Sequence, residues 1–110
     1  MVEAAQKALH FTAGKSRKDL TTDEQLALAV VRLIEIIGEA AAKVTPQLQE
    51  KYPSIPWKEI VGTRNRLIHG YEEVDLDIVW QIVTTDLRPL VPNLQEVINK
   101  EGGAGQQRLL

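Results

Sequence analysis

The segment from Leu26 to Val44 constrains the fold of this 110-residue chain more than any other feature. Its apolar side chains recur at spacings of three and four residues, which is the period of a helix buried along one face. Ile34 and Ile36 widen that stripe beyond what a single neighbouring helix would cover. We therefore predict a helix from about residue 22 to residue 44 that is buried on more than one side.

Further helices are predicted by the same period together with start and stop signals. Residues 2–13 carry an apolar stripe that Gly14 ends, and the following GKSRKDL has the composition of a polar loop. Thr21 and Glu24 have the spacing of a capping box, which places the start of the long helix directly after Thr21.

The second half of the chain is predicted to contain two more long helices. Thr45-Pro46 is typical of a helix start and opens a short helical turn ahead of them. A third helix is expected over residues 57–70, and a fourth begins at a cap formed by Asp75. Because Pro89 lacks a backbone donor, we expect a kink there rather than two separate helices.

No segment alternates apolar and polar residues between turn pairs as a hairpin strand would. The prediction is an all-α, up-and-down helical bundle of four main helices plus a short helical turn. Residues 1–100 are expected to form its single domain. The glycine-rich end EGGAGQQRLL, residues 101–110, is expected to be a flexible tail.

Composition restricts the classes of function. Cysteine is absent, so the chain carries neither a disulfide framework nor a thiolate zinc site, as is usual in the reducing cytoplasm where we expect it. Arg32 and Glu35 interrupt the longest apolar run, so no segment is expected to span a membrane. The net charge of −2 excludes a surface that is basic all over, so nucleic acid would have to meet a local basic patch.

The octapeptide RNRLIHGY, residues 64–71, contains two arginines, an asparagine, a histidine and a tyrosine within about two helical turns. Arg64 and His69 are five residues apart, which separates them by about 140° around an ideal helix. They converge on one site only if the helix ends at Gly70 and the long arginine side chain closes the gap. The spacing therefore permits a joint site without requiring one.

Simpler interpretations of these residues stay open at this point. A histidine followed by glycine at a helix end often serves only as a cation near the negative end of the helix dipole, and exposed arginines are usually solvated. The acidic cluster YEEVDLD, residues 71–77, offers carboxylates to a metal, but helix capping accounts for it better. We expect no metal site and no cofactor.

The octapeptide also matches a known motif. RNRLIHGY resembles the R-x4-H-x-Y motif of HEPN-domain proteins. Three longer segments resemble the DUF86 branch of the HEPN proteins, the HepT toxins of HepT–MntA toxin–antitoxin pairs. These segments are RLIEIIGEAA, YPSIPWKEIVGTRNRLIHGY and VDLDIVWQIVTTDLRPL. The similarity covers about residues 2–98. Relatives usually carry several more residues before MVEAAQKAL, so the first helix is expected to be shortened.

The resemblance implies a HEPN-like bundle that forms a homodimer, with two motifs in one cleft and a metal-independent endoribonuclease activity. By position, Arg64 and His69 would be the catalytic pair, and Asn65 the polar residue that follows the arginine. Tyr71 would be the tyrosine to which a nucleotidyltransferase antitoxin of the MntA type attaches AMP. To these we add Arg66 as a contact to RNA phosphate.

This set of residues suits RNA cleavage, because RNA carries its own nucleophile in the 2′-hydroxyl group. Histidine transfers protons near neutral pH, since its ordinary pKa is about 6.5. Arginine holds phosphate oxygens with a bidentate fork and stabilises charge in the transition state. One His69 per chain does not readily serve as base and acid in the same geometry, which favours a site shared by two copies.

Two other functions stand as alternatives to an RNA-cleaving toxin silenced by AMP transfer. The chain could be a non-catalytic helical docking module whose Tyr71 only contacts the nucleotidyltransferase. It could instead be an accessory subunit that binds ATP and cleaves no RNA. Expression without a partner separates the toxin from the docking module, since only a catalytic toxin arrests growth in a His69-dependent way.

Overall fold

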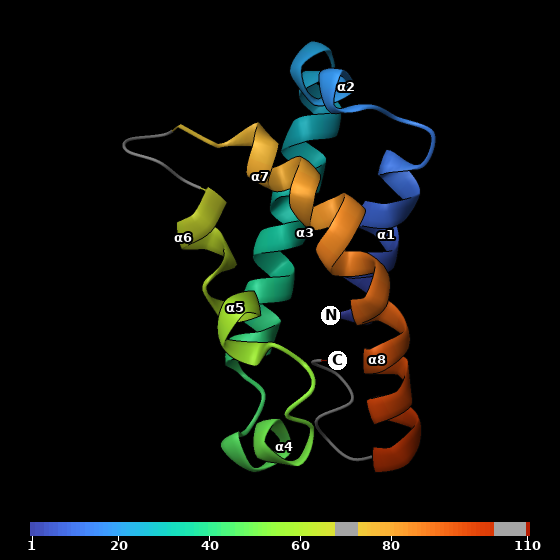
Figure 1. The fold of residues 1–110 in the computed structure, drawn as a ribbon, viewed down its shortest axis with the longest axis vertical. Helices are drawn as coiled ribbons and strands as arrows, with labels where there is room; N and C mark the ends of the chain where they lie inside the picture. Colours follow the sequence, from blue (N-terminus) through green and yellow to red (C-terminus); the bar gives the residue numbers. More distant parts are fainter. Residues whose placement is uncertain (68–72, 103–109) are drawn as a thin grey trace.

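The computed structural model describes residues 1–67, 73–102 and 110 (Figure 1). These residues form helices joined by short loops, with no β-strand in the described ranges. The predicted all-α class is therefore confirmed. No helix in the described part of the chain combines the length and the apolar character that crossing a bilayer requires.

From α1 to α6 the helices follow one another with connections of at most five residues. In chain order they are α1 (Val2–Thr12), α2 (Arg17–Thr22), α3 (Glu24–Ala42), α4 (Pro46–Lys51), α5 (Trp57–Val61), α6 (Thr63–Leu67), α7 (Leu76–Gln81), the π-helical turn η1 (Ile82–Asp86) and α8 (Leu87–Glu101).

Helix α3 lies at the centre of the bundle, as its wide apolar stripe predicts. Helices α1 and α8 lie on one side of it, and α5 and α6 lie on the other, while α7 crosses in front (Figure 1). Val30, Ile34, Ile37 and Ala41 of α3 are almost fully buried between these layers. Ile36, about 200° around the helix from Ile34, is also partly buried against the core, so α3 is buried on more than one side.

The start of α3 differs in detail from the prediction. Helix α3 is capped by Asp23, whose carboxylate accepts from the Leu26 N–H at 3.1 Å, rather than by Thr21. Thr21 belongs instead to α2, which begins inside the expected polar loop of residues 14–20 and continues past it to Thr22. A capping box opens α2, because the Asp19 carboxylate accepts from the Ser16 N–H at 2.7 Å. The loop prediction was wrong because Asp serves at the third helical position as Glu does.

Helix α4 begins as the Thr45-Pro46 pair predicts. The Thr45 hydroxyl accepts from the Leu48 N–H at 3.3 Å, and Pro46 takes the first helical position. The far end of α4 is joined to the end of α8, because the Tyr52 hydroxyl donates to the Glu101 carboxylate. Lys51 pairs with the same carboxylate at 2.9 Å.

The third predicted helix is interrupted. Gly62 separates α5 from α6, where one continuous helix was expected from residue 57 onward. Helix α5 approaches α3 closely at Gly38, since a Cβ placed on Gly38 would lie 3.1 Å from the Ile60 carbonyl oxygen. A side chain on α3 at this position would be crowded against α5, so glycine allows the close approach that seats α5 and the helix that follows it. Gly70, the expected end of the helix, lies outside the described residues.

The C-terminal helix begins as predicted and bends differently. The Asp75 carboxylate caps α7 by accepting from the N–H groups of Asp77 and Ile78 at 3.0 and 3.2 Å. The irregularity expected at Pro89 takes the form of η1, in which the Leu87 N–H bonds to the Ile82 carbonyl five residues earlier. A proline ring clashes with the carbonyl of the preceding turn, so a wider turn ahead of Pro89 gives the ring room.

Candidate functional site

Helix α6 carries the first half of the octapeptide, and the break before it sets its direction. Gly62 closes α5, and its carbonyl accepts from the Asn65 N–H at 3.1 Å in the first turn of α6. The buried Thr63 hydroxyl donates to the Glu59 carbonyl at 3.0 Å across the break. These bonds join α5 and α6 into one rigid corner, so the position of α6 follows from the seating of α5 on α3.

Arg64 projects from this corner toward the solvent and toward α3. Its side chain is 69% exposed, and its Nε lies 3.7 Å from the Glu35 carboxylate, which is 24% exposed. A partly exposed pair of this kind adds at most about 1 kcal/mol to stability. Its effect is therefore mainly geometric: the carboxylate of α3 holds one edge of the guanidinium while the rest of the fork remains accessible. Asn65 is exposed beside it.

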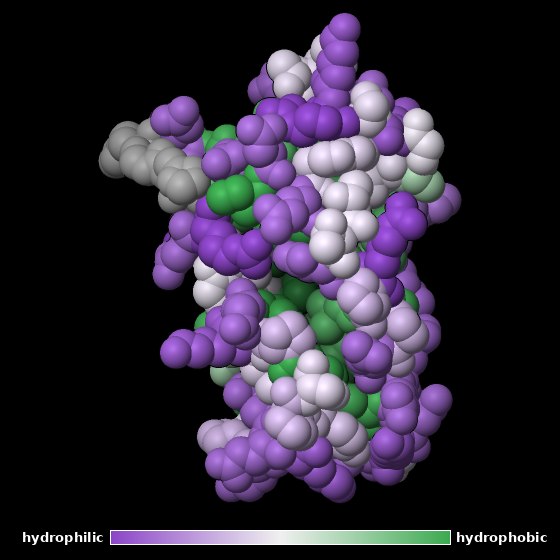
Figure 2. Space-filling view, in the orientation of Figure 1, coloured by the Kyte–Doolittle hydropathy of each residue, from purple (hydrophilic) through white to green (hydrophobic). Residues whose placement is uncertain are grey.

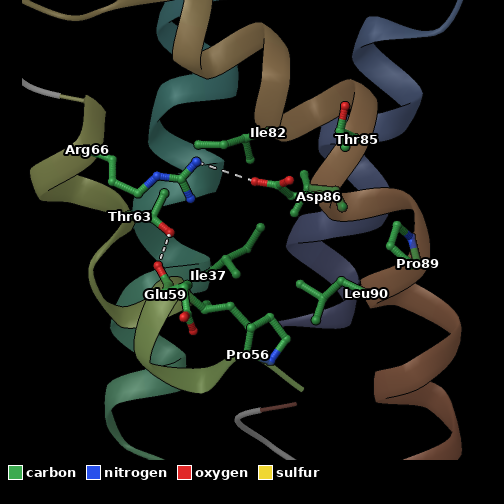
Figure 3. Close-up of a pocket in the computed structure, with 12 residues that line it drawn as sticks. Ile37, Pro56, Glu59, Thr63, Arg66, Ile82, Thr85, Asp86, Pro89 and Leu90 are labelled. Atoms are coloured by element: carbon green, nitrogen blue, oxygen red, sulfur yellow. Dashed lines mark hydrogen bonds and ion pairs between the residues drawn. The ribbon is translucent and has the colours of Figure 1, made fainter. Parts of the chain in front are cut away.

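Arg66 points to a different part of the surface. It follows Arg64 by two residues, which separates the two side chains by about 200° around the helix. Its guanidinium lies 3.6 Å from the Asp86 carboxylate of η1 (Figure 3). Arg64 and Arg66 within one chain therefore do not converge on one phosphate.

The Arg66–Asp86 pair stands at the edge of a hollow of about 530 Å³ between the α5–α6 corner and the η1–α8 segment. Figure 3 shows apolar side chains of α3, η1 and α8 at its back and side, with Glu59 near the lower edge. In the space-filling view the same region is an apolar recess framed by hydrophilic surface (Figure 2). Its wall residues include Ile37, Pro56, Ile60, Thr63, Ile82, Leu87 and Leu90.

The second half of the octapeptide lies outside the described residues, including both His69 and Tyr71. The chain on either side of it is firmly held. Leu67 is fully buried, and its carbonyl accepts from the Asp75 N–H at 2.7 Å. The end of α6 and the start of α7 are therefore hydrogen-bonded neighbours.

The described part of the acidic cluster, residues 73–77, stabilises the helices around it. Asp75 caps α7, as expected, and the Asp77 carboxylate accepts from the Arg17 Nε at 2.6 Å, which joins α7 to α2. Among the described residues, no three His, Asp or Glu side chains gather in a group that could hold a metal ion.

Sequence reasoning missed the two carboxylates that pair with the arginines of α6. Glu35 was treated only as an interruption of the apolar run, and Asp86 was assigned no role. A signal for Glu35 does exist, because this carboxylate stands between Ile34 and Ile36 in the apolar run, and a carboxylate that becomes partly buried needs a polar or charged partner. The pairing of Arg66 with Asp86 depends on the packing of α6 near η1, which no local pattern encodes.

The chain is similar to known proteins along nearly its whole length. The family model described as "Ribonuclease HepT-like" matches residues 1–100, which include every described helix up to the last turn of α8. The chain belongs to the ribonuclease HepT-like family. The resemblance to HEPN-domain HepT proteins inferred from RNRLIHGY and its flanking words is thereby confirmed.

Individual relatives within the HepT-like family agree with this assignment. A protein of Methanocaldococcus jannaschii named "Putative RNase MJ1380" is 36% identical over 98 residues, covering 89% of each chain. One of Caldanaerobacter subterraneus named "Putative RNase TTE0752" is 39% identical over 88 residues, covering 80% of this chain and 79% of its own. "Probable ribonuclease HepT" of Thermococcus cleftensis is 34% identical over 90 residues, covering 82% of each. No solved structure matches the chain.

Proposed function

We propose that the protein is the toxin of a toxin–antitoxin pair and acts as a metal-independent endoribonuclease of the HEPN type. The observation that carries the proposal is the match of residues 1–100 to the ribonuclease HepT-like family, in a chain that retains the complete R-x4-H-x-Y motif at residues 64–71. The described geometry supports it, because the motif arginine, Arg64, is exposed and oriented by Glu35 at the surface of the bundle.

In this proposal the RNA supplies the nucleophile. His69 of one chain removes the proton of the 2′-hydroxyl group, and the 2′-oxygen attacks the adjacent phosphorus. The bond from phosphorus to the 5′-oxygen breaks, and that oxygen receives a proton from the second His69 of a homodimer. The products are a 2′,3′-cyclic phosphate and a 5′-hydroxyl end, so no water and no metal enters this step. Proton transfer by a positioned histidine typically contributes about 10²–10⁴-fold.

Arg64 supplies positive charge where the phosphorane develops negative charge. The ion pair with Glu35 uses one edge of the guanidinium, which leaves the outer N–H groups for phosphate oxygens. Glu35 is in this view a positioning residue that limits the motion of Arg64. Asn65, exposed on the same turn, is the polar residue next to the catalytic pair.

Arg66 is proposed to contact RNA phosphate at the edge of the site, away from the reacting group. Its ion pair with Asp86 is partly exposed on both sides, at 38% and 39%, so an incoming phosphate can compete for the guanidinium. Contacts of this kind position a strand without reading its sequence.

The proposed control of this activity acts at Tyr71. A nucleotidyltransferase antitoxin of the MntA type would attach AMP to the tyrosine hydroxyl, which brings a bulky anion beside the phosphate-binding arginines. Added negative charge opposite an arginine cluster occupies the sites that substrate phosphates need. Cleavage should therefore fall as AMP is incorporated, and Tyr71→Phe should cleave RNA yet resist silencing.

The catalytic assignment is tested by comparing Arg64→Ala, His69→Ala and Arg32→Ala. Arg32 is a matched control, since it is 60% exposed and paired with Glu39 at 3.3 Å on the same kind of surface. The first two variants should lose RNA cleavage and growth arrest with unchanged helical content, while the third should retain both. Cleavage by the wild type should persist in EDTA. Equal activity in all three variants, or loss of activity in EDTA alone, would contradict the proposal.

A further inference from the structure

A second hollow, of about 320 Å³, lies on the other side of the bundle from α6. The end of α1 and the loop after it form one wall, and the α7–η1–α8 segment forms the other. Its chemically distinctive lining residues are Trp80, Lys15 and Arg88, beside Leu9, Thr12 and Thr84. In Figure 1 α1 and α6 lie at opposite edges of the molecule, with α3 and α7 between them. The hollow is therefore separate from the site around Arg64.

The charges of this hollow are unusual for an acidic protein. Within the described ranges, Arg17, Arg32, Arg64 and Arg66 each have a carboxylate partner within 4 Å, whereas Arg88 has none. Lys15 also forms no ion pair with a described residue. The nearby Asp19 carboxylate, whose pKa is lowered mainly by hydrogen bonds from Ser16 and only weakly by Lys15, is engaged in the capping box.

Two other hollows of the molecule are lined by more carboxylates than cations. The hollow beside Arg66 is lined by two carboxylates, Glu59 and Asp86, for its one guanidinium. A further hollow beside Arg17 is likewise lined by two carboxylates, Glu73 and Asp75. The hollow at Trp80 has two cations and no carboxylate among its lining residues. In a chain with a net charge of −2, it is a concave region suited to an anion.

The tryptophan in the wall of this hollow indicates which kind of anion would bind there. Trp80 is only partly buried, so part of its indole remains available at the hollow. The hydroxyl groups of Thr84 and Thr12 are occupied by carbonyls of their own helices, at 2.7 and 2.8 Å, and offer no free donor. A partly exposed indole between two cations that pair with no described carboxylate matches the combination by which proteins hold single-stranded nucleic acid, with bases stacked and phosphates neutralised.

We propose that the hollow at Trp80 binds single-stranded RNA, with one base stacked on the Trp80 indole and an adjacent phosphate held by Arg88 and Lys15. The inference rests on RNA being the substrate in the proposed function. It adds a binding site outside the motif, which holds the strand while another part of it reaches Arg64. It also supplies the local basic patch that an acidic RNA-binding protein requires.

The two tryptophans provide a direct readout of this site. Trp57 is only 6% exposed and donates its indole N–H to the Tyr52 carbonyl at 3.0 Å, so it is shielded from a bound base. The probe is an uncleavable 2′-O-methyl single strand of about ten nucleotides, within the range that such grooves cover. It should quench wild-type fluorescence, and Trp80→Phe should remove the quenching while the Trp57 signal remains.

Affinity for a fluorescently labelled copy of the probe tests the individual contacts. Trp80→Leu keeps an apolar side chain without a ring and should weaken binding by about 5- to 150-fold, the usual effect of losing one stacked base. Arg88→Gln and Lys15→Gln should each reduce the slope of log affinity against log salt by about 0.7. Lys43→Gln is the matched control, because Lys43 is exposed and lies outside the hollow, and its slope should equal that of the wild type.

The outcomes distinguish this inference from the proposed function. If Trp80→Leu and Arg88→Gln bind the probe as the wild type does, the inference is wrong even if Arg64 is needed for cleavage. The inference is also wrong if a duplex binds equally well and quenches equally, because stacking then plays no part. If the probe quenches Trp80 but no RNA is ever cut, the binding site stands and the proposed nuclease function is wrong.

Discussion

Leu67 offers the sharpest test of how α6 is anchored. Its side chain is fully buried at the end of the helix that carries Arg64, and its carbonyl accepts from the Asp75 N–H. Leu67→Ala removes three carbon atoms from the core and leaves the backbone bond in place. Leu94→Ala in α8 is a matched control, since Leu94 is equally buried and belongs to a different part of the bundle.

The expected loss of stability follows from the burial. Truncating a fully buried leucine to alanine costs about 2–5 kcal/mol, from the lost transfer free energy and the cavity that remains. A domain of this size has a total free energy of unfolding of about 5–15 kcal/mol, so a loss near the middle of the expected range leaves both variants folded at room temperature. Each kcal/mol should lower the melting temperature by roughly 4–8 °C.

The two leucine variants should differ in activity rather than in stability. Chemical denaturation at 25 °C gives the free energies of unfolding, and RNA cleavage is measured at a temperature where both variants are fully folded. We expect a similar loss of stability in both, with a greater loss of cleavage in Leu67→Ala, because a loosened α6 moves Arg64 away from its place beside Glu35. A cost below about 1 kcal/mol for Leu67→Ala alone would show that the end of α6 is not packed as described.

Two further predictions concern the contacts that hold the bundle together. A hydrogen bond from Tyr52 and the ion pair with Lys51 lower the pKa of Glu101 from its ordinary value of 4.5. The stability that the Glu101 carboxylate contributes is therefore complete above pH 4.5 and disappears as the pH falls through the folded-state pKa. Glu101→Gln should therefore be less stable than the wild type at neutral pH, and the difference should shrink on acidification; a difference independent of pH would contradict this. Gly38→Ala should gain about 1 kcal/mol of helix propensity but lose about 1–3 kcal/mol to overpacking against the Ile60 carbonyl. The free energy of unfolding, measured by thermal denaturation, should therefore change by about 0 to −2 kcal/mol. A full gain of 1 kcal/mol would mean that α3 and α5 are farther apart.

Much of the helix pattern could be predicted because its signals are local. The Thr45-Pro46 start, the Asp75 cap and the stop at Gly14, which has a φ of 74°, each depend on a few neighbouring residues. The helix α2 was missed although its capping box is just as local, because a run of polar residues was given more weight than the Ser16–Asp19 spacing.

Less of the candidate site could be predicted from the sequence. Arg64, Asn65 and Arg66 could be singled out from the motif, but their surroundings depend on which distant segments pack beside α6. Glu35 is 29 residues before Arg64 and Asp86 is 20 residues after Arg66 in the chain. Pairing over such separations is decided by tertiary packing, as is the assembly of Lys15, Trp80 and Arg88 from the two ends of the chain.

The π turn η1 determines the rotational phase between the two halves of the C-terminal helix. It contains one residue more than the α-helical turn it replaces, so side chains beyond Asp86 are turned by about 100° relative to an uninterrupted helix. On an uninterrupted helix Val79 and Leu90, eleven residues apart, would lie within about 20° of one face, so the offset turns the buried side of α8 away from that of α7. A relative that lacks one residue here would need a shifted apolar pattern throughout α8, so the length of this segment is constrained more tightly than its composition.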